Sequence, residues 1–152
     1  MVKPVLKKIL IIRFSSFGDV VQALNITSGI KRSYPDCEIV WLTKGIFKEV
    51  VEADRNVEKV VTLEGDFLGS LWKIFKFIRK SKFDLVYDAH KNLRTTLVKL
   101  LLSVSFTNIA WVERPKNRIK RILLFWFRKN YFPEPFYAKK SYETPVSNYF
   151  NF

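Results

Sequence analysis

The amino-acid sequence predicts an α/β protein, a Rossmann-like parallel sheet with helices on both faces. Apolar runs of strand length alternate with helical patterns along the chain, which implies right-handed crossovers between parallel strands. The runs are mostly continuous in Ile and Val rather than alternating with polar residues, as in strands that are buried on both faces. A chain of 152 residues that is 48% hydrophobic has enough apolar material for one domain without disulfides or a structural metal.

Five segments rich in Ile and Val are the expected strands: residues 8–14, 38–43, 59–63, 83–88 and 108–112. The intervening segments and the one that follows have helical patterns: residues 19–33, 46–53, 68–81, 92–103 and 116–130. Residues 1–130 thus form the predicted domain. Residues 131–152 carry prolines among aromatics without a clear period, and we expect an irregular tail there.

The net charge is strongly positive and unevenly distributed. The chain has 27 Lys and Arg against 14 Asp and Glu, which gives a formal charge of +13. Residues 1–68 carry only +1 of this charge, whereas residues 69–112 and 113–152 carry +6 each. A polyanion is the natural partner, whether nucleic acid, the phosphates of a lipid surface or acidic sugars. A basic surface that only aids solubility is the alternative.

Two basic stretches also carry large apolar side chains at helical spacing. In residues 71–82 the apolar side chains recur at intervals of three and four, and basic side chains fill the other face. Residues 118–128 repeat the pattern. This composition suits helices that lie at a membrane interface, and the same spacing is also that of aromatics packed in a core.

The sequence predicts neither secretion nor a transmembrane helix. The apolar run from Ile9 to Ile12 is too short for the core of a signal peptide, and Arg94 and Lys99 interrupt the most apolar later stretch. The lone Cys37 has no partner for a disulfide and no second thiol for a zinc site. A reducing, cytoplasmic compartment is therefore expected.

An open parallel sheet binds ligands just beyond the carboxyl ends of its strands, which marks residues 14–19, 43–45, 63–66 and 88–94. Two polar clusters lie in these stretches. The first is the turn Arg13-Phe-Ser-Ser-Phe-Gly-Asp19, at the start of a predicted helix. A helix N-terminus favours an anionic ligand or a fixed carboxylate, and Gly18 permits close approach of a ligand or a positive φ. Helix capping by Ser and Asp explains the same residues. The chain lacks both G-x-G-x-x-G and the P-loop pattern, so neither a dinucleotide cofactor nor ATP is implied.

The second cluster, Asp88-Ala-His-Lys-Asn-Leu-Arg94, follows the fourth predicted strand. The Arg94 guanidinium can bind a carboxylate or phosphate with two hydrogen bonds. His90 is the only histidine, and a lone histidine is more often a hydrogen-bonding residue than a catalytic one. Because the chain has no cluster of Cys or His, no metal site is expected.

Three blocks in order carry a resemblance to a known family: Ile9-Leu-Ile-Ile-Arg-Phe-Ser-Ser-Phe-Gly-Asp-Val-Val-Gln22, then Ile30-Lys-Arg-Ser-Tyr-Pro-Asp36 with Ile39-Val-Trp-Leu42, and Phe83-Asp-Leu-Val-Tyr-Asp-Ala-His-Lys-Asn-Leu-Arg94. They resemble the bacterial lipopolysaccharide heptosyltransferases, glycosyltransferase family 9. The resemblance implies a GT-B fold, of which this chain corresponds to the amino-terminal, Rossmann-like domain. In the family that domain binds the acceptor, the inner-core sugar of lipid A, at the cytoplasmic membrane face.

The resemblance also implies roles for both clusters. Asp19 stands where the family has its proposed general base, which deprotonates the acceptor hydroxyl as it attacks the anomeric carbon of an ADP-sugar. The residues that would bind the acceptor, with its acidic sugars and phosphates, are Ser15, Ser16, Gly18, His90, Lys91, Asn92 and Arg94.

Two departures from the family pattern change what is expected of this chain. Gln22-Ala-Leu-Asn25 stands where many members have His-Thr-Leu-Pro, so the contacts of that histidine are missing. Family members also have a carboxyl-terminal domain that binds the ADP-sugar, and nothing in this sequence corresponds to it. We therefore expect an acceptor-binding half that is truncated, split from a separately encoded donor domain, or degenerate. It should be inactive alone and have no cofactor of its own.

The alternative is a non-enzymatic module that binds anionic glycolipid or an anionic membrane surface through its basic residues. It predicts salt-sensitive vesicle binding, which should weaken when the basic residues of 71–82 are neutralised: Lys73, Lys76, Arg79 and Lys80. Nucleic-acid binding is disfavoured because the sequence has no recognisable binding motif. The enzyme interpretation places the protein as a peripheral protein at the inner face of the cytoplasmic membrane.

Overall fold

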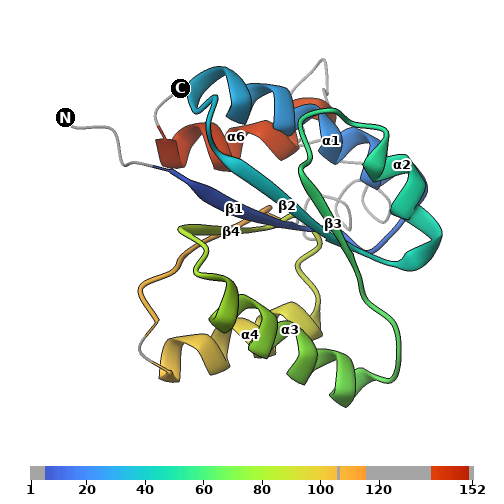
Figure 1. The fold of residues 1–152 in the computed structure, drawn as a ribbon, viewed down its shortest axis with the longest axis vertical. Coiled ribbons are helices and arrows are strands. Elements are labelled where there is room, and N and C mark those ends of the chain that lie inside the picture. The colour runs from blue at the N-terminus through green and yellow to red at the C-terminus, as the bar shows by residue number, and fades with distance from the viewer. Residues whose placement is uncertain (1–5, 106, 116–137, 151–152) are drawn as a thin grey trace, which may run out of the picture.

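The computed structural model describes residues 6–105, 107–115 and 138–150, which are built around one parallel sheet (Figure 1). Its five strands are β1 (Lys8–Ile12), β2 (Glu38–Thr43), β3 (Lys59–Thr62), β4 (Leu85–Asp88) and β5 (Ala110–Glu113). They lie in the order β3-β2-β1-β4-β5, and every neighbouring pair is parallel. The predicted fold class, a Rossmann-like α/β sheet, is confirmed.

Helices cover both faces of the sheet, as predicted. They are α1 (Phe17–Ser33), the 3₁₀ turn η1 (Gly45–Phe47), α2 (Lys48–Glu52), α3 (Phe67–Ser81), α4 (Leu93–Val104) and α6 (Ala138–Phe150). Figure 1 shows α1, α2 and α6 on one face and α3 and α4 on the other. The predicted helix at 116–130 and the basic stretch at 118–128 lie outside the described residues. Among the helices that are described, none is both long enough and apolar enough to span a bilayer.

The two faces of the sheet have separate apolar cores. Ile9 and Ile11 of β1 are buried together with residues of α1 and α6, whereas Leu10 and Ile12 are buried together with residues of α3 and α4. Because both faces of β1 are covered, the strand is apolar at every position from Ile9 onward, which is the continuous pattern that the sequence shows.

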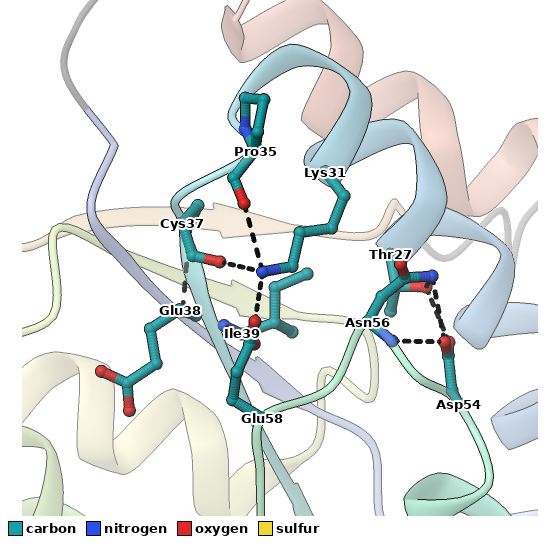
Figure 2. Close-up of polar contacts among 9 residues, drawn as sticks. All are labelled: Thr27, Lys31, Pro35, Cys37, Glu38, Ile39, Asp54, Asn56 and Glu58. Atoms are coloured by element: carbon teal, nitrogen blue, oxygen red, sulfur yellow. Dashed lines mark hydrogen bonds and ion pairs between the residues drawn. The ribbon is translucent and has the colours of Figure 1, made fainter.

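Polar side chains tie α1 to the loops at the amino-terminal edge of the sheet (Figure 2). The Lys31 ammonium forms an ion pair with Glu58, which accepts a hydrogen bond from the backbone N–H of Ile39 at 2.7 Å. Nearby, Thr27 Oγ1 donates a hydrogen bond to Asp54 Oδ2 at 2.7 Å. These contacts fix the beginnings of β2 and β3 at the edge opposite the polar clusters that follow β1 and β4.

The expectation of an irregular tail over residues 131–152 is wrong for its last part, because residues 138–150 form α6. Tyr142 and Val146, one turn apart, are both buried in the core against α1. Pro145 lies inside this helix and lowers its intrinsic helix propensity. Burial of the two apolar side chains outweighs that propensity, which the local sequence alone could not indicate. Helix α6 is therefore part of the domain rather than an appendage.

Candidate functional site

The two predicted polar clusters meet at one point of the sheet. The chain connections leave β1 and β4 in opposite directions, since β1 leads to β2 and β4 leads to β5, and such a switch point is where open α/β sheets bind ligands. The Arg13 side chain, buried just after β1, donates a hydrogen bond from Nη1 to the carbonyl oxygen of Ala89, just after β4. This buried contact holds the two clusters side by side.

The Asp19 carboxylate, in the first turn of α1, is held by three side chains. Tyr142 Oη donates a hydrogen bond to Oδ1 at 2.7 Å, Ser16 Oγ donates one to Oδ2 at 3.1 Å, and the Arg13 guanidinium forms an ion pair with Oδ2. The side chain of Asp19 nevertheless stays 37% exposed. The carboxylate is thus fixed in position and still accessible from solvent.

The surroundings of Asp19 favour its ionised form. Partial burial by itself raises the pKa of this carboxyl, but the hydrogen bond from Tyr142, the charge of Arg13 and the hydrogen bonds from Ser16 together outweigh that effect and lower the pKa. Asp19 is therefore an ionised hydrogen-bond acceptor at neutral pH. A carboxylate with a lowered pKa is a weak base, so any role in proton transfer depends on its position more than on its basicity.

Arg114 and Tyr142 complete the surroundings of Asp19, and the sequence analysis identified neither. The guanidinium carbon of Arg114 lies 3.5 Å from the centroid of the Tyr142 ring, and Arg114 Nη1 lies 4.0 Å from Asp19 Oδ1. Burial lowers the pKa of Arg114. Because Arg114 directly follows β5, the rule that ligands bind at carboxyl ends of strands could have found it. Tyr142 carries no such signal.

The turn after β4 is built on Asp88 and Asn92. The fully buried Asp88 accepts hydrogen bonds at Oδ1 from the backbone N–H groups of His90 at 3.0 Å and Lys91 at 2.7 Å. Burial raises the pKa of Asp88 despite these bonds. Asn92 is the N-cap of α4: its Oδ1 accepts from the Thr95 N–H at 2.9 Å, and its own N–H donates to Thr95 Oγ1 at 3.0 Å. The local sequence folds this way because short polar side chains satisfy the free N–H groups of a turn and a helix start.

A pocket of about 260 Å³ opens between the two clusters. Its lining residues are Phe14, Ser15, Lys44, Phe67, His90, Asn92, Leu93 and Arg94. The His90 ring meets the edge of Phe14 with a centroid distance of 5.3 Å, and the Arg94 guanidinium carbon lies 5.1 Å from the Phe67 centroid. Arg94 Nε is buried without a hydrogen-bond partner among the described residues. The pocket thus combines aromatic walls with the cationic side chains of Lys44 and Arg94.

Lys44 lies in the stretch 43–45 that the strand-end rule marks, whereas the expected acceptor-binding residues Ser16, Gly18 and Lys91 are not part of the pocket lining. Lys91 Nζ forms an ion pair with Glu113 Oε2 at 3.0 Å, and Lys91 is not among the residues that line the pocket. Gly18 does not have a positive φ, and a Cβ at this position would meet no atom within 4 Å. Across the described residues, no three His, Cys, Asp or Glu side chains gather as a metal site would require.

Comparisons with known proteins relate the chain to glycosyltransferases. No family model matches it. It is 28% identical over 99 residues to lipopolysaccharide heptosyltransferase 1 from Campylobacter coli, which covers 63% of this chain and 29% of that protein. Among solved structures, the glycosyl transferase family 9 from Veillonella parvula DSM 2008 superposes with a TM-score of 0.66 at 18% identity, covering 93% of this chain and 41% of that one. E. coli heptosyltransferase WaaC with ADP-2-deoxy-2-fluoro heptose superposes with a TM-score of 0.65 at 16% sequence identity, covering 95% of this chain and 49% of that one.

These matches confirm the resemblance and set its extent. The structural matches establish the Rossmann-like fold of one half of a GT-B glycosyltransferase, and the sequence match is to part of a heptosyltransferase. The chain spans half or less of the length of each of these relatives. In both sequence and fold it is similar to part of the lipopolysaccharide heptosyltransferases of glycosyltransferase family 9.

Proposed function

We propose that this chain is the acceptor-binding half of a heptosyltransferase-like glycosyltransferase, with Asp19 as its general base. The observation that carries the proposal is the Asp19 carboxylate, fixed by Tyr142, Arg13 and Ser16 and still 37% exposed at the ligand-binding edge of the sheet. An ionised carboxylate in a fixed position can accept a proton from a hydroxyl placed against it.

The pocket chemistry suits an acidic sugar as the acceptor. Arg94 and Lys44 are cationic, and a guanidinium can hold a carboxylate or phosphate with two hydrogen bonds. Phe14 and Phe67 offer apolar faces to the carbon side of a sugar ring. The resemblance to heptosyltransferases makes the inner core of lipid A the proposed acceptor. Such an acceptor is held in the cytoplasmic membrane, so the enzyme would act at the inner face of that membrane.

In the proposed reaction, the acceptor hydroxyl oxygen forms a bond to the anomeric carbon of the heptose. The bond between that carbon and the phosphate oxygen of ADP-heptose breaks, and its electron pair leaves with ADP. The hydroxyl proton passes to Asp19. General-base assistance of this kind contributes about 10²–10⁴-fold in rate.

The ADP-heptose donor would bind a second domain that faces this edge of the sheet, either continuous with this chain or separately encoded. The 152 residues alone are therefore expected to bind the acceptor without transferring sugar. The alternative of a non-enzymatic module gains no support from the named relatives.

A calorimetric titration with heptose-free lipid A core oligosaccharide, freed of its acyl chains, tests the proposal. The chain should bind the oligosaccharide, and Arg94→Gln should weaken binding by about 10-fold, since a charge-assisted hydrogen bond contributes about 1.5–3 kcal/mol. Arg55→Gln, which removes an exposed cation at the opposite edge of the sheet, is the matched control and should leave binding unchanged. Absence of binding, or equal losses in both variants, would contradict the proposal.

A further inference from the structure

Helices α3 and α4 form a layer whose outer face is basic and carries no acidic residue. Neither helix contains Asp or Glu. Four exposed cations lie on α3: Lys73, Lys76, Arg79 and Lys80. In the part of the chain that the structure describes, none of them takes part in an ion pair. Their charge is therefore uncompensated locally.

Large apolar side chains are exposed on the same layer. Leu68 and Trp72, one turn apart on α3, are 72% and 50% exposed, and Leu100 and Val104 on α4 are 60% and 69% exposed. The Lys76 ammonium lies 5.3 Å from the centroid of the Trp72 ring, so the cation and the aromatic ring are neighbours. The inward side of α3 is separate, since Ile74, Phe75 and Ile78 fill the core.

The opposite helical layer has a different charge pattern. There, Lys31 is paired with Glu58 and Lys48 with Glu52, and α1 and α2 contain both acidic and basic residues. Figure 1 shows that the two layers lie on opposite faces of the sheet. Among the described residues, one helical layer therefore has only basic charged residues together with exposed apolar side chains, and the other has mixed charge.

We propose that the outer face of α3 and α4 binds the surface of an anionic phospholipid bilayer. Trp side chains favour the boundary between water and acyl chains, and Lys and Arg near it are attracted to acidic headgroups while their stems cover apolar surface. The exposed aliphatic side chains of Leu100 and Val104, one turn apart on α4, gain from burial in lipid and offer no ring on which a nucleic-acid base could stack. A bilayer therefore fits this face better than a nucleic acid.

The placement also suits an enzyme whose acceptor is in the membrane. Phe67 and Leu93, the first residues of α3 and α4, line the pocket. A bilayer against these two helices would lie next to the mouth of the pocket. The lipid-binding proposal itself rests only on the exposed side chains of the two helices and not on the proposed sugar transfer.

Vesicle binding tests the proposal, with phosphatidylcholine vesicles that contain or lack phosphatidylglycerol. The chain should co-sediment with the anionic vesicles, and high salt should release it. The double variant Lys76→Gln/Lys80→Gln should weaken the partition by about 25-fold, since each cation near an anionic surface contributes about 5-fold. The matched control Arg32→Gln/Arg55→Gln removes two exposed cations from the opposite side of the sheet and should change the partition by less than about 2-fold.

A second measurement does not depend on charge variants. Bromine-labelled acyl chains should quench part of the tryptophan emission of the wild type, and Trp72→Phe should reduce that quenching. Equal weakening in the two double variants, binding to neutral vesicles alone, or quenching that is undiminished in Trp72→Phe would overturn the proposal. So would a single-stranded oligonucleotide that displaces the vesicles and binds the same four cations more tightly. The vesicles carry no sugar acceptor, so failure of the sugar-transfer proposal would leave this result unaffected.

Discussion

The hydroxyl of Tyr142 donates a hydrogen bond to Asp19 Oδ1 at 2.7 Å, joining two residues that are 123 positions apart in the chain. Burial and the bond to Asp19 raise the pKa of Tyr142 to about 12, so the phenol stays protonated and donating at any physiological pH. Arg114 stacks on the same ring. Helix α6 thereby helps to set the position and the ionisation of the candidate base.

Tyr142→Phe should raise the pKa of Asp19, because it removes the strongest of the interactions that lower it. The pKa of Asp19 is lower in the folded protein than in the unfolded chain, so the ionised carboxylate stabilises the fold at pH values above its pKa in the unfolded chain. This stabilisation is lost as the pH falls through the pKa of Asp19 in the folded protein. The variant should reduce that loss and lower stability at neutral pH by about 1 kcal/mol. Carbon-detected NMR titration of the Asp19 carboxyl measures the shift. Tyr34→Phe, at the far end of α1, should leave the Asp19 pKa where it is, and an unshifted pKa in Tyr142→Phe would refute the assignment.

Val146→Ala should destabilise the domain by about 2 kcal/mol, because Val146 is buried in the core shared with α1. Asn148→Ala, on the exposed side of the same helix, should change stability by less than about 0.5 kcal/mol. Urea unfolding of both variants measures the difference. Equal and small effects would mean that α6 does not contribute to the core.

Asp88→Asn should leave the free energy of unfolding at neutral pH unchanged or raise it. The amide oxygen can still accept the N–H groups of His90 and Lys91, while the cost of a buried charge disappears. Burial makes the pKa of Asp88 higher in the folded protein than in the unfolded chain. As the pH falls from the higher of these pKa values towards the lower one, Asp88 is protonated in the folded protein first, and the wild type becomes more stable. The difference in stability between variant and wild type should therefore shrink on mild acidification. A loss of about 3 kcal/mol or more at neutral pH, measured by urea unfolding, would show that the turn needs the ionised carboxylate.

Cys37 should react slowly with thiol reagents in the native protein. Its side chain is fully buried, and burial raises the pKa of the thiol to about 12, so the reactive thiolate is scarce at neutral pH. Labelling should follow the opening of the fold and become fast in denaturant. Rapid, complete labelling without denaturant would contradict the buried position.

The sheet was predictable because a strand that is buried on both faces is apolar at consecutive positions in the sequence. The run from Glu38 to Thr43 is the β2 strand with the predicted bounds, and the clusters ending at Asp19 and Arg94 were found because they follow strands. Side-chain direction was not predictable in the same way. Lys91 is a neighbour of His90 in sequence, yet it pairs with Glu113 rather than lining the pocket.

The part of the candidate site that could not be predicted from the sequence depends on tertiary contacts. Tyr142 reaches Asp19 only because α6 packs against α1, and no local pattern around Pro145 indicates that helix. Lys44, by contrast, directly follows β2 and lies in a stretch that the strand-end rule marks, and Arg114 directly follows β5, where the same rule could have identified it.

The central claim is that an acceptor hydroxyl is placed against Asp19, and one NMR titration tests it most directly. The carboxyl carbons of the aspartates are followed while heptose-free core oligosaccharide is added to the purified chain. We predict that the Asp19 signal shifts to saturation with the binding curve, whereas the signal of Asp54, at the opposite edge of the sheet, stays constant. Binding of the oligosaccharide with no change at Asp19 would contradict the account.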